Sequence, residues 1–389
     1  MRSDIIIVGA GPAGLALARS LIGVGLQIRV IDKHPANELS NPSYDGRDIA
    51  LTHGSKRILT NLGIWNRLPQ NEIFPIHNAR VLDGNSRYAL KFSRQEANVD
   101  ALGFIVSNHQ IRRVLYEAVA NSKEITLKTG CTVTSVYPRS NSISISLNNG
   151  ATFTTSLLVA ADSRFSTLRQ AVGIPARNRD FGRAAIVCRM EHRAENHAVA
   201  SECFQYGQTI AVLPLTNHLS SIVITVTTDW ARKLAAMTEP TFTQWVTRKL
   251  NGQFETMRLV TDRFVYPLVA VLADRFAGIR TALIGDAAVG MHPVTAHGYN
   301  LGLSGQERLA QLVIDAHRRE QDIGALNLLQ QYAVHHRRVV LPLYLGTNSL
   351  VGLYTAEYRP TKILRKVLLH AANHCRPMRQ VVIDRLVDQ

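Results

Sequence analysis

Three glycines near the start of the chain have the spacing of a dinucleotide-binding turn. Gly9, Gly11 and Gly14 follow the apolar run 4–8 and open the small-residue segment 13–22. In such a strand–turn–helix unit the first glycine makes the turn, the second lets the backbone approach a pyrophosphate, and the third lets helix and strand pack closely. The helix N-terminus would point its N–H groups and its dipole at the phosphates. A glycine-rich turn without a ligand is the alternative.

Asp32 favours the ligand-binding interpretation. It ends a second apolar run, 27–31, and lies eighteen positions after Gly14. An acid in this place accepts hydrogen bonds from a ribose 2′-hydroxyl. The carboxylate would repel a 2′-phosphate, so it favours FAD or NAD over NADP.

A glycine–acid pair with the same logic lies about 270 residues downstream. Gly285 and Asp286 follow the apolar run 281–284. An acid at the end of a buried strand faces the crevice where ligands bind in open α/β sheets. Asp286 would reach a polyol hydroxyl of the cofactor. Because a nicotinamide enzyme needs no second acid of this kind, the pair favours a flavin.

A loop and a helix follow this pair. His292 and Pro293 would steer the loop, and the helix would begin within the run Gly298, Tyr299, Asn300 and Leu301. Bare backbone N–H groups at a helix N-terminus can offset negative charge that grows on a reduced flavin ring. His292 and His297 are candidates for a direct chemical role. The alternative is that both only pack the loop.

A middle segment also combines an acid with the start of a helix. Asp162 follows the apolar run 156–161, with Ser166 and Arg169 one and two turns further along. This arrangement could line the ligand crevice. It could equally be an ordinary helix cap.

Composition narrows the class of protein. The chain has 389 residues, 46% hydrophobic and 19% charged, which is typical of a globular protein with two or three domains. Its four cysteines are scattered without a C-x-x-C pair, so we expect neither a zinc site nor a disulfide framework, and no metal site at all. No signal peptide or membrane-spanning segment is expected.

The net charge of +15 suggests an anionic partner. No nucleic-acid-binding motif is present, so we predict no nucleic-acid partner and favour a membrane surface. The segment 359–389 alternates basic and apolar residues, as an amphipathic helix in a headgroup layer would. A solvated helix that covers the fold is the alternative.

The order of elements predicts an α/β fold with a strand-rich insertion. Apolar runs at 4–8, 27–31 and 281–284 indicate buried strands, and 183–228 indicates further strands, with many β-branched residues from 219 to 228. Helices are expected at 56–65, 108–120 and 242–250, and from Asn300 onward. We predict a discontinuous cofactor domain (1–75, 103–176, 265–340), a β-sheet substrate domain (76–102, 177–264) and a C-terminal helical segment (341–389).

Taken together, the three motifs resemble the fingerprints of single-component flavoprotein aromatic hydroxylases. Within that family, 285–302 and the strand pair 211–215 and 220–223 resemble the ubiquinone-biosynthesis hydroxylases. The resemblance covers nearly the whole chain. It implies a Rossmann-like FAD-binding domain of the p-hydroxybenzoate-hydroxylase type, interrupted by a β-rich substrate domain.

The resemblance also implies a reaction and the residues that serve it. FAD is bound, NAD(P)H reduces it transiently, and O2 supplies the hydroxyl group. Asp32 would bind ribose, Asp286 the ribitol chain, and 298–301 would lie beneath the flavin pyrimidine. Arg47, Asp162 and Arg112 or Arg113 would lie near the pyrophosphate. The expected substrate-binding residues are Leu213, Pro214 and Pro293.

Departures from the family pattern bear on substrate and reductant. Ser163 replaces the usual glycine of the middle fingerprint, and Val289 replaces a common histidine. Ala296-His297-Gly298 replaces the Gly-Gln-Gly that is common in the family, and an aspartate that is usual near Gly305 is missing. These variants resemble a branch that hydroxylates a demethoxyquinol at its last open ring position.

The substrate implied is a polyprenylated phenol or quinol. A lipid substrate would explain the basic surface and tail, with the protein in the cytoplasm and in peripheral contact with the inner membrane or a ubiquinone-biosynthesis complex. Two alternatives remain open, namely an oxygen-independent flavin oxidoreductase such as a prenyl reductase, and a non-catalytic flavin-binding subunit.

Overall fold

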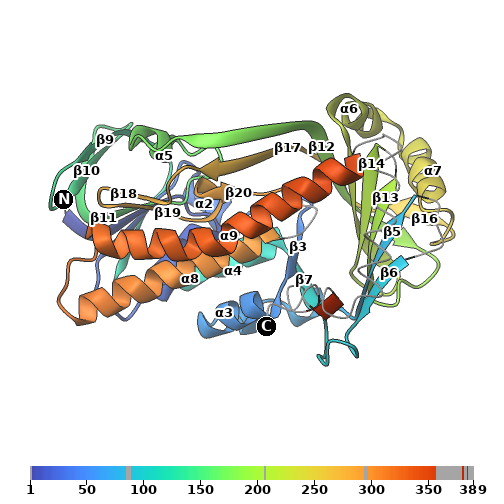
Figure 1. Cartoon of the computed structure of the whole chain (residues 1–389), viewed down its shortest axis with the longest axis horizontal. Helices are drawn as coiled ribbons and strands as arrows, with labels where there is room; N and C mark the ends of the chain where they lie inside the picture. Colours follow the sequence, from blue (N-terminus) through green and yellow to red (C-terminus); the bar gives the residue numbers. More distant parts are fainter. Residues whose placement is uncertain are drawn as a thin grey trace.

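The computed structural model describes residues 2–84, 89–205, 207–292 and 297–355, together with 379, 380 and 383. Pro293 and nearly all of the basic segment 359–389 therefore lie outside the described residues. Figure 1 shows two bodies. In one, the strands pack against long helices, and the other is built around a broad sheet. Two long strands, β12 and β17, run from the first body to the second.

The first body is built on parallel strands whose central residues are mainly apolar and buried. We call them the parallel sheet: β8 (Ile125–Lys128), β2 (Ile28–Ile31), β1 (Arg2–Val8), β11 (Thr152–Ala160) and β19 (Thr281–Leu283), in that spatial order. Ile5, Ile6 and Ile7 have no solvent exposure, as expected of a central strand covered on both faces. Strands β9 (Val133–Pro138), β10 (Ile143–Leu147) and β18 (Ala277–Gly278) add antiparallel edges.

Helices cover this sheet and contact one another closely. Helix α1 (Pro12–Ser20) packs against α4 (Asn108–Ala120) and α8 (His297–Arg318), and α8 packs against α9 (Leu326–Thr355). Gly305 permits the last contact, because a Cβ there would lie 2.7 Å from the His336 ring. Within the described residues, no helix combines the length and apolarity needed to cross a bilayer. Shorter helices are α2 (Ala36–Ser40), α3 (His53–Asn61) and α5 (Thr167–Ala171).

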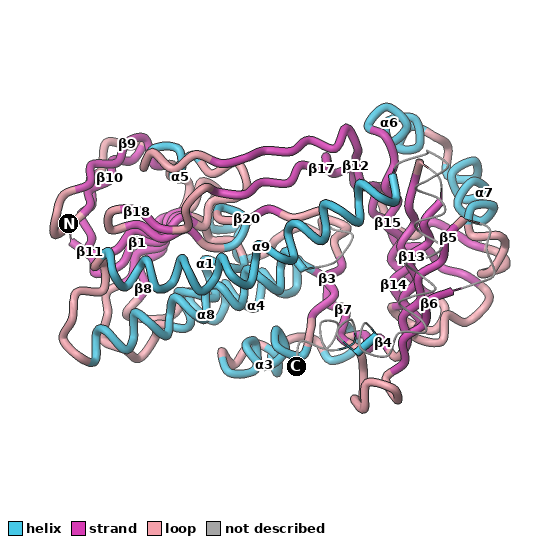
Figure 2. Tube along the Cα trace, viewed as in Figure 1, coloured by secondary structure: helices cyan, strands magenta, loops and turns pink. Residues whose placement is uncertain are grey.

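The second body is a broad, mostly antiparallel sheet, which we call the large sheet. In the described residues it has nine strands, in the order β20-β17-β12-β15-β14-β13-β5-β6 with β16 beside β12 (Figure 2). Their bounds are β5 (Asn78–Asp83), β6 (Ala89–Ser93), β12 (Ala176–His192), β13 (Val199–Gln205), β14 (Gln208–Pro214), β15 (Leu219–Thr227), β16 (Met257–Leu259), β17 (Phe264–Ala273) and β20 (Val289–Gly290). A small sheet, β3 (Asp48–Leu51), β7 (Gly103–Ser107) and β4 (Phe74–Ile76), lies between the bodies.

The two faces of the large sheet are covered differently. Helices α6 (Thr228–Ala236) and α7 (Glu239–Lys249) close one face, whose side chains Ile186, Ile210, Val212, Ile222 and Ile224 are fully buried. We call it the helix-covered face. On the opposite face, the central residues Ala211 and Val223 remain partly exposed. We call this side the open face.

The mixed α/β fold predicted from the sequence is confirmed, and helix α4 has the predicted bounds. Other helix limits were wrong. Helix α3 begins at His53 rather than Lys56, because the Thr52 side chain caps it by accepting a hydrogen bond from the Ser55 N–H. Helix α8 begins at His297, one residue before the run 298–301 in which its start was predicted, and α6 was not predicted at all.

Candidate functional site

The predicted motifs meet at the carboxyl edge of the parallel sheet. Val8, Ala160 and Leu283 lie side by side in parallel register, and Ile31 pairs with Val8 on the other side. The glycine turn, Asp32, the Asp162 segment and the Gly285-Asp286 pair therefore all start from the same edge. In open α/β sheets this is the edge where ligands bind.

The glycine turn fits a pyrophosphate. A Cβ on Gly9 would lie 2.2 Å from the Ala161 carbonyl oxygen, and one on Gly14 would lie 2.0 Å from the Gly9 carbonyl oxygen. These two glycines are therefore required by the protein's own packing. Among the described residues, a Cβ on Gly11 would meet no atom within 4 Å, and Gly11, the N-cap residue of α1, has no side chain that could cap the helix. The open space at Gly11 and the uncapped N–H groups leave room for an anionic ligand.

The start of α8 reaches the same place. A Cβ on Gly302 would lie 3.5 Å from the Gly285 Cα, and one on Gly285 would lie 3.0 Å from the Ala13 Cβ. The N-terminal turn, the acid loop and the first turn of α8 are thus in direct contact. A Cβ on Gly298 would meet no atom of the described residues within 4 Å.

Asp32 is held at the mouth of the glycine turn. Its Oδ2 accepts a hydrogen bond of 2.6 Å from the Ala10 N–H, and its Oδ1 accepts one of 2.8 Å from the His34 N–H. The side chain is 11% exposed, so one edge of the carboxylate remains accessible. The position is compatible with ribose binding, which stays a prediction.

Arg47 belongs to a polar cluster that the sequence did not reveal. Its guanidinium donates to the Asp45 carboxylate at 2.6 Å, and the Asn108 side-chain amide donates to the same oxygen at 2.8 Å. The Tyr266 hydroxyl donates to the Asp45 carbonyl oxygen at 2.5 Å. Burial lowers the pKa of Arg47, but the hydrogen bond and charge of Asp45 outweigh it and raise the pKa. Arg112 lies one turn beyond Asn108 on α4 and is partly exposed.

Asp286 is paired with an arginine that sequence reasoning missed. The Arg164 guanidinium donates to Asp286 at 3.1 Å and to the Val269 carbonyl oxygen at 3.0 Å. Asp286 keeps 40% of its side chain exposed. The charge of Asp286 also contributes to the raised pKa of Arg47, so the carboxylate and the guanidinium interact electrostatically. Arg164 lies two residues after Asp162, but spacing alone could not assign it a partner.

Asp162 is engaged with the helix that follows it. Its carboxylate accepts hydrogen bonds from the Ser166 hydroxyl at 2.5 Å and from the Leu168 N–H at 3.1 Å. These contacts are those of a residue that caps the following helix, α5, and a role of Asp162 near the pyrophosphate stays a prediction. Ser163 has φ of +111°, a conformation that favours the glycine usual there. The chain retains the family's backbone turn at a cost in strain.

The Asn300 side chain connects three segments. Its Oδ1 accepts hydrogen bonds from the Ser55 hydroxyl at 2.6 Å and the Thr52 N–H at 3.1 Å. Its Nδ2 donates to the Ala50 carbonyl oxygen at 3.0 Å. Asn300 thus fixes the start of α8 against β3 and α3, and a place for residues 298–301 beneath the flavin stays a prediction.

The remaining predicted residues near α8 are mainly buried. His292 is 3% exposed, and its ring lies edge-on to Phe181 at 5.0 Å between centroids. Burial, aided by the charge of Arg183, lowers the pKa of His292 to about 4, so the imidazole is neutral at physiological pH. Burial raises the pKa of Tyr299, and Leu301 is 4% exposed. His297 is the first residue of α8 and is partly exposed.

Leu213 and Pro214 point to opposite faces of the large sheet, because side chains alternate along a strand. Leu213 lies on the open face and packs near Ile76 and Ile105. Pro214 shares the side of Val212, on the helix-covered face. Of this predicted pair, Leu213 alone lies on the open face.

A second polar cluster connects the large sheet to the cofactor side. Arg189 on β12 donates to both oxygens of Asp48, at 2.6 and 3.1 Å, and to the Ser107 hydroxyl at 2.5 Å. Its guanidinium lies 4.9 Å from the centroid of the Tyr44 ring, which packs edge-on against Phe264. The open face is therefore directed toward segment 44–48. No motif in the sequence marks these residues.

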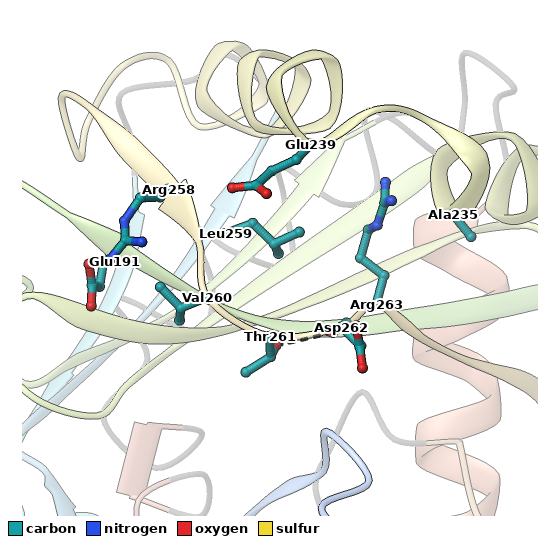
Figure 3. Close-up of a pocket in the computed structure, with 9 residues that line it drawn as sticks. All are labelled: Glu191, Ala235, Glu239, Arg258, Leu259, Val260, Thr261, Asp262 and Arg263. Carbon is teal, nitrogen blue, oxygen red and sulfur yellow. Dashed lines mark hydrogen bonds and ion pairs between the residues drawn. The ribbon is translucent and has the colours of Figure 1, made fainter.

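A surface hollow of about 1090 Å³ lies elsewhere. It is lined by Glu191, Glu239, Arg258 and Arg263 among others, beside α6, α7 and β16 (Figure 3). Glu191 and Arg258, which face each other on the paired strands β12 and β16, form an ion pair at 2.6 Å on one side of it. None of the predicted site residues lines this hollow.

Comparisons with known proteins agree with this geometry. Residues 2–340 match the family model described as an FAD binding domain. The chain is 46% identical to ubiquinone hydroxylase UbiM of Neisseria meningitidis, over 99% of this chain and 85% of that protein. It is 32% identical to ubiquinone hydroxylase UbiL of Rhodospirillum rubrum, over 97% and 88%.

A solved structure shows the same fold. The p-nitrophenol 4-monooxygenase PnpA of Pseudomonas putida superimposes with a TM-score of 0.78 at 18% identity, over 99% of this chain and 98% of that one. The family match, the relatives and the cradle at Gly11 all indicate FAD as the cofactor. The chain belongs to the FAD-binding family and is an FAD-dependent monooxygenase of the group that contains the ubiquinone hydroxylases.

Proposed function

We propose that this protein hydroxylates the aromatic ring of a polyprenylated phenol or quinol in ubiquinone biosynthesis. The observation that carries the proposal is the meeting of three distant segments at one edge, 9–14, 285–286 and 298–302, next to a sheet face that is apolar and partly open. The names of the relatives supply the substrate class.

The residues present would hold FAD along the carboxyl edge. Gly11 and the first turn of α1 would receive the pyrophosphate, Asp32 the ribose, and Asp286 the ribitol chain. The N–H groups of 298–301 would lie beneath the flavin pyrimidine. When bound, FAD takes electrons from NAD(P)H and activates O2 for transfer of a hydroxyl group. The protein's part is to position the two ligands and to exclude water.

Oxygen labelling tests the reaction. Purified holoenzyme with NADPH, 18O2 and a short-tailed prenylphenol should give a product heavier by one 18O atom. An oxygen-independent reductase would give no labelled product, and a non-catalytic subunit would show no substrate-dependent NADPH consumption. For the cofactor site, Asp286→Ala should yield protein without the yellow flavin spectrum, with Asp274→Ala as a control on an exposed acid.

The finer substrate assignment is a demethoxyquinol hydroxylated at its last open ring position. It is supported by the departures at Ser163, Val289 and 296–298 from the common pattern. Quinone intermediates that accumulate in a deletion strain, identified by mass spectrometry, test it. Accumulation of an intermediate that already carries this ring oxygen would contradict it.

We further propose contact with an anionic membrane surface. The net charge of +15 supports it, and so do the exposed apolar side chains Val334 and Leu345 on α9, with Arg338 exposed between them. The basic segment 359–389 would add to this contact. Truncation after Tyr358 should weaken binding to vesicles that contain phosphatidylglycerol, and unchanged binding would contradict a role for the segment.

A further inference from the structure

A cavity of about 310 Å³ lies where helices α3, α8 and α9 meet. Its lining includes Arg57 from α3, Glu307 and Arg308 from α8, and His335 and His336 from α9. Helix α8 packs against both of the other helices, so the cavity is bounded by elements that contact one another. None of the residues predicted to hold the flavin or the substrate lines this cavity.

Positive charge in this cavity exceeds negative charge. Arg57 and Arg308 contribute two cations, and Glu307 is the one acid among the described residues that line it. Glu307 is already engaged, because it accepts hydrogen bonds from the Arg57 guanidinium at 2.8 and 2.9 Å. The Nε atom of Arg308 is buried and has no hydrogen-bond partner in the described part of the chain. The cavity therefore offers a guanidinium to an anion from outside the protein.

His336 supplies a second buried polar group. It is 2% exposed, and its ring is held by Phe276 and Tyr332 at 5.6 and 5.7 Å between centroids. Its Nε2 atom has no hydrogen-bond partner among the described residues. A buried polar atom without a partner costs free energy, so its place in a cavity wall points to a group that occupies the cavity. Burial, aided by the charge of His335, lowers the pKa of His336 to about 4, so the neutral ring keeps one N–H to donate.

The surface beside the cavity is apolar and basic. On α9, Val334 directly precedes His335 and is 51% exposed, and Arg338 is exposed one turn further along. Leu345 is 55% exposed and lies on the side of Val334, because eleven residues complete about three turns. An anionic lipid combines a phosphate with apolar chains, which matches a basic cavity next to exposed apolar side chains. A water-soluble phosphate compound would leave Val334 and Leu345 in solvent.

We propose that this cavity binds the phosphate group of an anionic lipid headgroup, an inference that rests on the proposed membrane contact. Arg308 donates to phosphate oxygens, and the His336 N–H donates from the inner wall. Arg57 stays paired with Glu307 and adds positive charge on the solvent side, where its side chain is 57% exposed. The bound lipid thus makes α9 the side of the protein that faces the membrane.

The location of the cavity relates it to the proposed reaction. Arg308 lies ten residues after Gly298 on α8, which is about 15 Å at 1.5 Å per residue. The first turn of α8 is predicted to lie beneath the flavin. A headgroup bound at Arg308 therefore keeps the cofactor side of the protein near the membrane, which is the source of a prenylated substrate.

The test measures how the full-length holoenzyme partitions onto vesicles made of equal parts of phosphatidylcholine and phosphatidylglycerol. Arg308→Gln is compared with Arg318→Gln, which removes the same charge from an exposed position about 15 Å further along α8. We expect Arg308→Gln to lower the partition coefficient by about tenfold or more, and Arg318→Gln by less than about threefold. Both variants should keep their flavin and melting temperature. Equal effects would show that only overall charge matters and would overturn the site.

Soluble phosphate distinguishes a lipid site from a site for free phosphate. Inorganic phosphate is added at constant ionic strength, so that screening does not change. We expect vesicle binding of the wild type to change by less than about twofold. Displacement of the wild type from the vesicles by phosphate, without such displacement in Arg308→Gln, would assign the cavity to free phosphate and overturn the lipid.

Ser304→Asp tests the same cavity without removing an arginine. Ser304 also lines the cavity and lies four residues before Arg308 on α8, so an aspartate there would pair with the Arg308 guanidinium. We expect vesicle binding to fall as much as in Arg308→Gln. Binding at wild-type strength in Ser304→Asp would contradict the proposal, whether or not Arg308→Gln folds.

Failure of the membrane contact itself has a different signature. A wild-type protein that does not bind phosphatidylglycerol vesicles would overturn that contact and the lipid site together. Vesicle binding that Arg308→Gln and Ser304→Asp both retain would overturn the cavity alone. Neither measurement requires hydroxylation, so a failure of the proposed reaction is detected separately, from NADPH consumption.

Discussion

The carboxyl edge of the parallel sheet and the open face of the large sheet form their sites by different means. At the edge, the lack of a side chain on Gly9, Gly14, Gly285 and Gly302 lets residues 9–14, 161, 285 and 302 approach one another closely. On the open face, backbone geometry is ordinary, and the character of the surface depends on which side chains occupy alternate positions. Substitutions should therefore act on folding and cofactor binding in the first region, and on substrate handling in the second.

The largest expected effect is at Gly14. A Cβ at this position would lie 2.0 Å from the Gly9 carbonyl oxygen, an overlap that backbone atoms cannot relieve locally. Gly14→Ala should therefore lower the free energy of unfolding by roughly 3 kcal/mol or more, at the upper end of single substitutions. Urea denaturation of the purified apoprotein measures this. A stable, flavin-loaded Gly14→Ala protein would show that the edge tolerates side chains and would remove the contrast.

Gly11→Ala should separate folding from cofactor binding. Its Cβ would meet no atom of the described part of the chain, so the apoprotein should unfold at the wild-type urea concentration. The same methyl group would occupy the space predicted for the pyrophosphate, and we expect FAD affinity to fall about 100-fold, or about 2.7 kcal/mol. Titration of apoprotein with FAD, followed by flavin fluorescence, checks it. Unchanged affinity would contradict the pyrophosphate assignment.

Ala211 tests the open face. Ala211 lies on the open face of the large sheet. Ala211→Leu should fill part of the space over this face and raise KM for a prenylphenol by about tenfold, or 1.4 kcal/mol, with FAD content unchanged. The matched change on the helix-covered face is Ile210→Ala, which should leave KM unchanged but cost about 2–5 kcal/mol of stability through a cavity. Equal effects of the two variants on KM would mean that the faces do not differ in function.

The smallest effect concerns the pH dependence of stability. The pKa of Glu202 is raised in the folded state to about 8 from 4.5. As pH rises from 5 to 8, the unfolded chain releases a proton that the folded protein retains, so the wild type loses stability over this window. Because the side chain is partly exposed, we expect a loss of roughly 1–2 kcal/mol in total. Glu202→Gln should lack it, as measured by urea denaturation at pH 5, 6.5 and 8.

The same contrast explains what the sequence could predict. Glycines and strand-end acids have fixed spacings, because the turn and the cofactor impose them, so 9–14, Asp32 and 285–286 were recognisable one by one. Arg164, Asp45 and Asp48 were not recognisable, because each contacts a partner more than sixty positions away in the sequence. No local pattern encodes the strand register that brings such partners together. The raised pKa of Glu202 on β13 could not be predicted for the same reason. A single acid in a strand gives no sign of its environment until the neighbouring strands are placed.

The contact between Gly285, Gly302 and Ala13 also sets an order of events during synthesis. The first glycine turn leaves the ribosome early, but the surface that completes it is translated almost 290 residues later. At 5–20 residues per second, roughly 15–60 s separate the two. Flavin capture is therefore a late event in the life of the nascent chain. Until then β1 can pair with β2 and β11 and pack against α1, but the cofactor site lacks Gly285, Asp286 and the start of α8.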